Sequence, residues 1–199
     1  MLEYIKKLNH FFEKQDSYLS VQDNNARKRL HIEDTAWPGK PLLDFLNTIK
    51  PVTDFNFMIK IEESSKQMVQ PPHSDWYKGF HTCLIPLRWY GDVYTVEYNQ
   101  IYTGHNEGGF KYRPTGNTYY KNEWLSKDAE ELSGLTENDF DKKFFKKYLK
   151  DTVYYEDLYG LTVNKTHKWT LGKPIVFPCE VLHSGSKYQV VKRWLVCHW

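Results

Sequence analysis

Two histidines and one aspartate have the residue types and spacing of a metal site. His73 and Asp75 are two residues apart in PPHSDWYKGF, and His183 comes much later, after the apolar run PIVFP. On a strand, residues i and i+2 point to the same face, so an imidazole and a carboxylate can share one target. Two histidines and one carboxylate form a facial triad, which suits non-haem Fe(II) and leaves coordination positions open. Each residue alone is more often an ordinary hydrogen-bonded polar group, so the interpretation depends on all three.

A charged residue in the last apolar segment supplies a second feature. Arg193 lies ten residues after His183, within VVKRWLVCHW. A guanidinium inside an otherwise apolar strand is costly without an anionic partner, and a dicarboxylic co-substrate would match it with bidentate hydrogen bonds. Lys192 is the rival for this role, because neighbours in a strand alternate and only one of them can face the cavity. We favour Arg193, which shares a face with Leu195 and Cys197.

Composition indicates a globular, β-rich chain. The 199 residues are 40% hydrophobic and 26% charged, which argues against general disorder, and 17% aromatic, which favours pleated and half-buried surfaces. The net charge is +2 and the lysines are scattered, so the sequence lacks the basic footprint of a nucleic-acid-binding protein. The short basic cluster NARKRLH (25–31) is interpreted as a solvated surface.

Cysteine usage and apolar run lengths indicate the compartment. Cys83, Cys179 and Cys197 have no CxxC spacing, which favours reduced thiols in a cytoplasmic protein. The amino-terminal segment lacks the apolar core of a signal peptide, and no apolar run approaches the roughly 20 residues of a membrane span. We therefore expect a soluble, cytoplasmic protein with no membrane partner.

The elements that must position these side chains fall into three groups. Helices are expected over 2–12 and 39–49, where apolar residues recur on one face. The segment 139–149 repeats aromatic residues every four positions and is also expected to be helical, whereas NEGGFKYRPTGN (106–117) is interpreted as a mobile loop. Strands are expected over 55–62, 80–87, 92–102, 167–171, 174–178 and 187–199.

The order of these elements predicts one domain over residues 1–199. Helices come first, then strands, then a helical insertion, then strands again, without regular alternation of strand and helix. This order favours a mainly β fold, an antiparallel sandwich or barrel with helices packed outside.

Taken together, these segments resemble the Fe(II)/2-oxoglutarate-dependent oxygenases, and in particular their compact prolyl-hydroxylase-like members. The resemblance is carried by HSD (73–75), HTCLIPL (81–87), TVEYNQ (95–100), FPCEVLHSG (177–185) and Arg193. It implies a double-stranded β-helix core, jelly-roll or cupin-like, formed by 55–102 and 167–199. The segment 1–54 would then be an N-terminal helical support, and 103–166 a loop and helical insertion.

The resemblance also implies roles for individual residues. His73, Asp75 and His183 would bind Fe(II), and Arg193 would pair with the distal carboxylate of the co-substrate 2-oxoglutarate. O2 would be the oxidant, with 2-oxoglutarate decarboxylated to succinate. Because the carboxylate of Asp75 is present, the implied reaction is a hydroxylation or a related oxidation.

The substrate side of the site is less defined. The resemblance favours a peptide or protein side chain, with a small metabolite as the other class. Trp76 and Tyr77 are candidates for the pocket rim, with surface cover as the equal alternative, and His81 is interpreted as a packed or substrate-facing group. The alternative function is a non-catalytic, cupin-like barrel that binds a metal or small ligand, which would not require Arg193.

Overall fold

The computed structural model describes residues 2–14, 20–22, 27–32, 39–49, 58–65, 72–75, 80–101, 111–113, 116–120, 140–158, 161–189 and 191–199. The helices are α1 (Leu2–Lys14), α2 (Gly39–Ile49), α4 (Lys142–Phe144), the π-helix η3 (Phe145–Leu149) and the 3-10 helix η4 (Tyr155–Leu158). The strands are β1 (Ser20–Gln22), β2 (Arg27–Ile32), β3 (Met58–Ser64), β4 (His81–Trp89), β5 (Tyr94–Ile101), β6 (Lys111–Arg113), β7 (Gly116–Tyr120), β8 (Val163–Lys168), β9 (Ile175–Pro178), β10 (Val181–Gly185) and β11 (Lys192–His198). None of the helices in these ranges is both long and apolar enough to cross a lipid bilayer.

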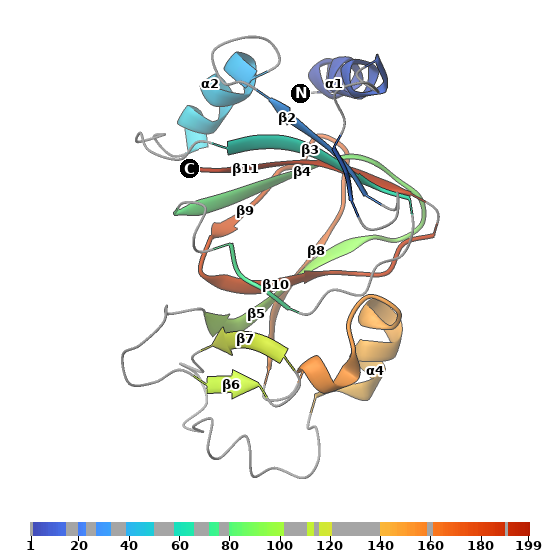
Figure 1. The fold of residues 1–199 in the computed structure, drawn as a ribbon, viewed down its shortest axis with the longest axis vertical. Coiled ribbons are helices and arrows are strands. Elements are labelled where there is room, and N and C mark those ends of the chain that lie inside the picture. The colour runs from blue at the N-terminus through green and yellow to red at the C-terminus, as the bar shows by residue number, and fades with distance from the viewer. Residues whose placement is uncertain are drawn as a thin grey trace.

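Two antiparallel sheets face each other across the molecule (Figure 1). The larger sheet has the strand order β1-β2-β3-β11-β4-β9, and the smaller has the order β10-β5-β8. From β8 to β11 the chain changes sheet at every step, which holds the two sheets opposite one another. The fold is therefore mainly β and antiparallel, with helices outside the sheets, as the composition and the order of elements predicted.

The main apolar core lies outside the larger sheet, under the helices. Alternate residues of β3, β4 and β11 point outward and pack against α1 and α2. The buried residues of this core, from helices and strands together, include Ile5, Leu8, Phe12, Leu42, Leu46, Ile59, Ile61, Cys83, Ile85, Leu87, Leu195 and Cys197. A second cluster covers the smaller sheet on its far side, where Val96, Tyr98 and Leu182 pack against η3 and η4 residues such as Leu149 and Leu158. The space between the sheets holds polar side chains beside a third apolar cluster, which includes Trp169 and Phe177.

Most predicted elements are confirmed, with ends shifted by a few residues. The helices predicted over 2–12 and 39–49 are α1 and α2, and the helical part of 139–149 is α4 followed by η3. The strand predicted at 167–171 instead starts earlier, as β8, and ends at Lys168.

Two predictions about the flanking segments are wrong. The segment 1–54 is not helical throughout, because β2 adds to the larger sheet beside β3, with Arg29 paired to Glu62. Residues 27–31 of the basic cluster 25–31 are thus part of a strand and not merely a solvated surface. The segment 103–166 also holds β6 and β7, which pair antiparallel within the stretch 106–117 and just beyond it, where a loop was predicted.

The three cysteines are free and buried. Cys83 and Cys197 are register partners on β4 and β11, under the helices. Burial, with the neighbouring Cys83, raises the pKa of the Cys197 thiol well above its ordinary value. The pair therefore behaves as small apolar residues of the core.

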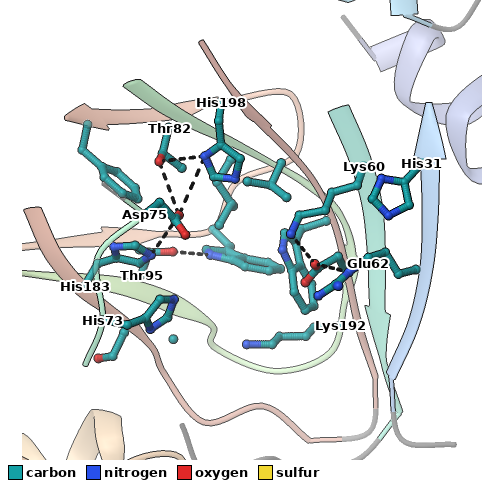
Figure 2. Close-up of a pocket in the computed structure, with 18 residues that line it drawn as sticks. His31, Lys60, Glu62, His73, Asp75, Thr82, Thr95, His183, Lys192 and His198 are labelled. Atoms are coloured by element: carbon teal, nitrogen blue, oxygen red, sulfur yellow. Dashed lines mark hydrogen bonds and ion pairs between the residues drawn. The ribbon is translucent and has the colours of Figure 1, made fainter. Parts of the chain in front are cut away.

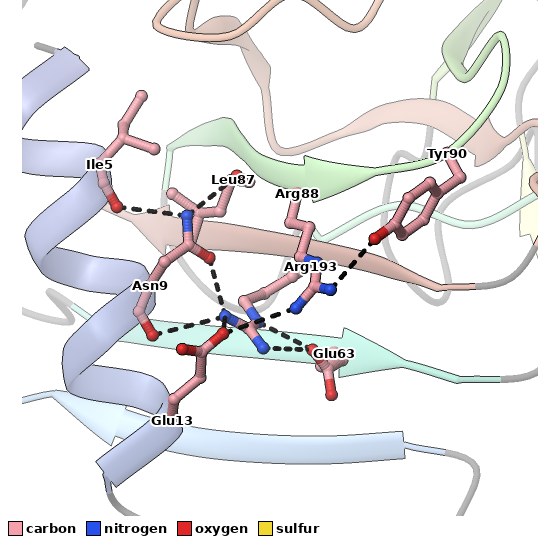
Figure 3. Close-up of polar contacts among 8 residues, drawn as sticks. All are labelled: Ile5, Asn9, Glu13, Glu63, Leu87, Arg88, Tyr90 and Arg193. Carbon is pink, nitrogen blue, oxygen red and sulfur yellow. Dashed lines mark hydrogen bonds and ion pairs between the residues drawn. The ribbon is translucent and has the colours of Figure 1, made fainter.

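Arg193 ties α1 to the larger sheet (Figure 3). Its side chain is 4% exposed and lies on the helix-facing side of β11, with Nη2 2.6 Å from Glu63 Oε2. Nη1 donates to Asn9 Oδ1 at 2.8 Å and lies 3.2 Å from Glu13 Oε1, and the guanidinium sits 4.5 Å from the centre of the Phe12 ring. The prediction that Arg193 faces the cavity is therefore wrong. An internal carboxylate, Glu63, supplies the anionic partner that a buried guanidinium needs.

We expect Arg193→Met to lower the free energy of unfolding by about 3 kcal/mol, because the change leaves the carboxylate of Glu63 largely buried without its main partner. Urea denaturation followed by circular dichroism measures the loss. Arg88→Met is the matched control, since Arg88 also contacts Glu13 but its side chain is 45% exposed, and we expect it to cost less than about 1 kcal/mol. Equal losses in the two variants would contradict this account of α1 docking.

Candidate functional site

A pocket of about 460 Å³ opens between the two sheets (Figure 2). Alternation along β11 determines which of its side chains face the pocket. Lys192, Trp194, Val196 and His198 line the pocket, whereas the residues between them point to the helices. The same alternation on β3 turns Lys60 and Glu62 inward and the neighbouring isoleucines outward. The volume lies in the range of small-molecule sites.

His73, Asp75 and His183 come together at one end of this pocket. His73 and His183 lie directly opposite each other in an antiparallel bridge, with N–H···O distances of 3.0 and 2.8 Å in the two directions. Because opposite residues in such a bridge share a face, their rings lie 4.5 Å apart, centre to centre. His183 Nε2 is 3.7 Å from Asp75 Oδ2, and the Asp75 amide donates to the Cys179 carbonyl at 2.8 Å. The three predicted residues are thus neighbours, and their binding of a metal stays a prediction.

The donor types fit a two-histidine, one-carboxylate centre, but the donor atoms do not converge. His183 Nδ1 lies 3.1 Å from the Val181 carbonyl, which leaves Nε2 on the side of Asp75. An imidazole held in this way by a backbone carbonyl is common among metal ligands. Within the described ranges, however, no three His, Cys, Asp or Glu side chains are placed so that they could hold a metal ion. Metal binding here therefore requires rotation of side chains about their χ angles.

Thr82 and His198 support the carboxylate of Asp75. Thr82 Oγ1 donates to Asp75 Oδ2 at 3.4 Å and lies 3.2 Å from His198 Nδ1 and 3.3 Å from Cys179 Sγ. His198 Nδ1 is itself 3.9 Å from Asp75 Oδ2. Sequence reasoning assigned neither residue to the site. Alternation along β4 and β11 could have found them, because Thr82 and His198 share the pocket face with Lys192.

The other end of the pocket is basic. Lys60 Nζ lies 2.9 Å from Glu62 Oε1, and Arg29 Nε donates to the same oxygen at 2.8 Å. Lys192, the rival of Arg193, lines the pocket, with Nζ 5.1 Å from the centre of the Trp194 ring. Of the two neighbouring cations, Lys192 is therefore the one that faces the cavity.

The expected substrate-facing residues have different outcomes. Trp76 and Tyr77 lie outside the described residues. His81 lies on the face of β4 opposite to Thr82, with its ring centre 5.5 Å from that of Trp199. Among the described residues, it is not one of those that line the pocket. Of the two roles predicted for His81, packed or substrate-facing, the structure favours packing, because successive side chains of a strand point to opposite faces.

Comparison with known proteins leaves the family open. No protein-family model and no curated protein matches the chain. Matching solved structures include two of oxalate oxidase, one in complex with the substrate analogue glycolate and one of the recombinant enzyme with glycolate. Each has a TM-score of 0.36 and 9% identity over 89% of this chain and 54% of the other. Another is Cellulomonas parahominis L-ribose isomerase with no ligand, with a TM-score of 0.39 and 12% identity over 98% and 81% of the two chains.

The chain spans about half the length of the oxalate oxidase chains that it matches. With TM-scores below 0.5, these likenesses carry no conclusion about fold or activity. The functional argument therefore depends on the geometry of the pocket.

We expect Thr82→Val to lower the free energy of unfolding by about 1–3 kcal/mol, because it removes a buried hydroxyl that contacts Asp75 and His198 while keeping the side-chain shape. Urea denaturation of the protein without added metal measures this loss. Thr166→Val on β8, at an exposed position, should change the same quantity by less than about 0.5 kcal/mol. An unchanged Thr82→Val protein would show that the hydroxyl does not support Asp75.

Proposed function

We propose that this chain is an Fe(II)- and 2-oxoglutarate-dependent dioxygenase with a double-stranded β-helix core. It would hydroxylate a peptide or protein side chain or a small metabolite and decarboxylate 2-oxoglutarate to succinate. One observation carries the proposal: His73, Asp75 and His183 gather at one end of a pocket that Lys192 also lines. The strand changes between two facing sheets support the double-stranded β-helix.

The proposal assigns a role to several residues that line the pocket. His73, Asp75 and His183 would hold Fe(II), which with 2-oxoglutarate supplies the activation of O2. Lys192, not Arg193, would pair with the distal carboxylate of 2-oxoglutarate. Thr82 Oγ1 keeps the carboxylate of Asp75 oriented.

The walls of the pocket would exclude water from the reacting groups. Trp169, Trp194 and Phe177 line the pocket, and the Trp169 indole donates to Thr95 Oγ1 at 3.0 Å, which fixes its ring. A dry and rigid wall of this kind strengthens electrostatic contacts inside the site and limits side reactions.

A second candidate is a cupin-like protein that binds a metal or small ligand without catalysis. One observation favours it. Arg193, the residue expected to pair with 2-oxoglutarate and not required by a purely binding barrel, is tied to Glu63.

Anaerobic titration with Fe(II) and 2-oxoglutarate tests the oxygenase proposal. We expect a visible charge-transfer absorption band in the wild-type protein, and succinate formation after oxygen is admitted. Asp75→Ala and His183→Ala should remove the band, because each deletes a metal ligand. Lys192→Met should lower the affinity for 2-oxoglutarate at least about tenfold, which is the loss typical of a charged hydrogen bond, while leaving the affinity for Fe(II) nearly unchanged.

The exposed Lys187 provides the control. Lys187→Met removes one positive charge nearby and should leave both affinities unchanged. If the wild-type protein binds neither Fe(II) nor 2-oxoglutarate, the oxygenase proposal is wrong. Iron binding without 2-oxoglutarate binding or succinate would instead support the cupin-like candidate.

A further inference from the structure

The basic end of the pocket offers a second binding position, distinct from Lys192. We propose that Arg29 and Lys60, both held by Glu62, bind the anionic group of the primary substrate, which is then a molecule with a carboxylate or phosphate on an apolar body. This inference rests on the proposed function, because it takes the pocket as the active site and names the class of molecule that occupies it.

The position of the cluster sets the reach of the substrate. Lys60 is the register partner of Val196, two residues before His198 on β11. Strand geometry then places the Cα atoms of Lys60 and His198 about 8 Å apart. Figure 2 shows Lys60 and Glu62 at the opposite end of the pocket from Asp75 and His183. A small molecule held at Lys60 would therefore present its other end to the histidines and Asp75.

The charge of the lining favours an anion. At the basic end, Arg29 and Lys60 are two cations against the single carboxylate of Glu62 among the described lining residues, without counting Lys192. The side chains of Lys60 and Glu62 are only 9% and 6% exposed, so their charges are poorly screened by solvent. An excess of positive charge in such a cavity attracts an anionic ligand.

The contacts of Arg29 and Lys60 with Glu62 indicate which kind of ligand these two cations can bind. Arg29 and Lys60 both contact one oxygen, Oε1, of the carboxylate of Glu62. Two cations that converge on one carboxylate oxygen can share a second oxyanion, since arginine and lysine each carry several N–H donors. The competing explanation is a closed structural ion cluster, in which Glu62 alone satisfies both cations.

Apolar and aromatic walls lie along the pocket between its polar ends. They are Leu84, Trp169, Phe177, Trp194 and Val196. Val196 and Leu84 stand in the same cross-strand row as Lys60, and Trp194 stands in the row of Glu62 and Arg29. An apolar body next to the anionic group would bury its surface against these side chains.

Calorimetric titration of the full chain without added metal tests the inference. The probes are benzoate, its uncharged isostere benzamide, and inorganic phosphate. We expect one of the two anions, benzoate or phosphate, to bind more tightly than benzamide. Lys60→Met should lower the affinity for that anion at least about tenfold and leave the affinity for benzamide unchanged. The preferred probe distinguishes a carboxylate from a phosphate substrate.

Three further variants separate the explanations. Lys60→Arg keeps the charge and should retain anion binding within a few-fold, which guards against misfolding of Lys60→Met. Lys192→Met should also retain anion binding, because Lys192 is assigned to 2-oxoglutarate. Lys40→Met removes an exposed lysine of α2 that pairs only with Asp44 among the ion pairs described, and it should have no effect.

Two results would overturn the inference. One is a wild-type protein that binds neither anion better than benzamide. The other is a Lys60→Met variant that binds the anion as tightly as the wild type, which would make the cluster a structural ion cluster. Neither result involves iron or turnover, so failure here is distinct from failure of the oxygenase proposal, which shows in the Fe(II) and succinate measurements.

Discussion

The strict alternation of side chains on β11 is the constraint on which the rest of the structure depends. One face of this strand carries Leu195 and Cys197 into the core under α1 and α2, and the other carries Trp194 and His198 into the pocket. A one-residue slip of the strand would exchange the two sets, burying Lys192 under the helices and exposing the core residues to the cavity. The pairing of β11 with β3 on one side and β4 on the other over its full length prevents such a slip.

This constraint explains why two adjacent cations have opposite roles. Arg193 faces the helices, where burial would be prohibitive without the carboxylate of Glu63 and the polar groups of Asn9. Lys192 faces the pocket, where aromatic rings and solvent are available to its ammonium group. The pair therefore joins the stability of the α1 contact to the chemistry of the pocket through one strand.

Sequence patterns predicted the elements better than they predicted the faces. Periodicity located α1, α2 and most strands, and the spacing of His73, Asp75 and His183 correctly placed them near one another. Alternation also required that only one of Lys192 and Arg193 face the cavity, but it could not say which. That choice depends on Glu63, a partner far away in sequence, whose position only the pairing of β3 with β11 defines.

The same limit explains the residues that sequence reasoning missed. Lys60 faces the pocket through alternation on β3, and Arg29 does so because β2 pairs with β3, whereas the mostly basic sequence RKRLHI of β2 gave little sign of a strand. The larger sheet thus supplies the basic end of the pocket, whereas His73 and His183 belong to the smaller sheet and the segment bridged to it. One strand nevertheless reaches both ends, because β11 carries His198 beside Asp75 and Val196 in the row of Lys60. Arg29 differs, because it lies on β2, two strands away from β11, so a change of this side chain alters the basic end while the bridge between His73 and His183 stays in place.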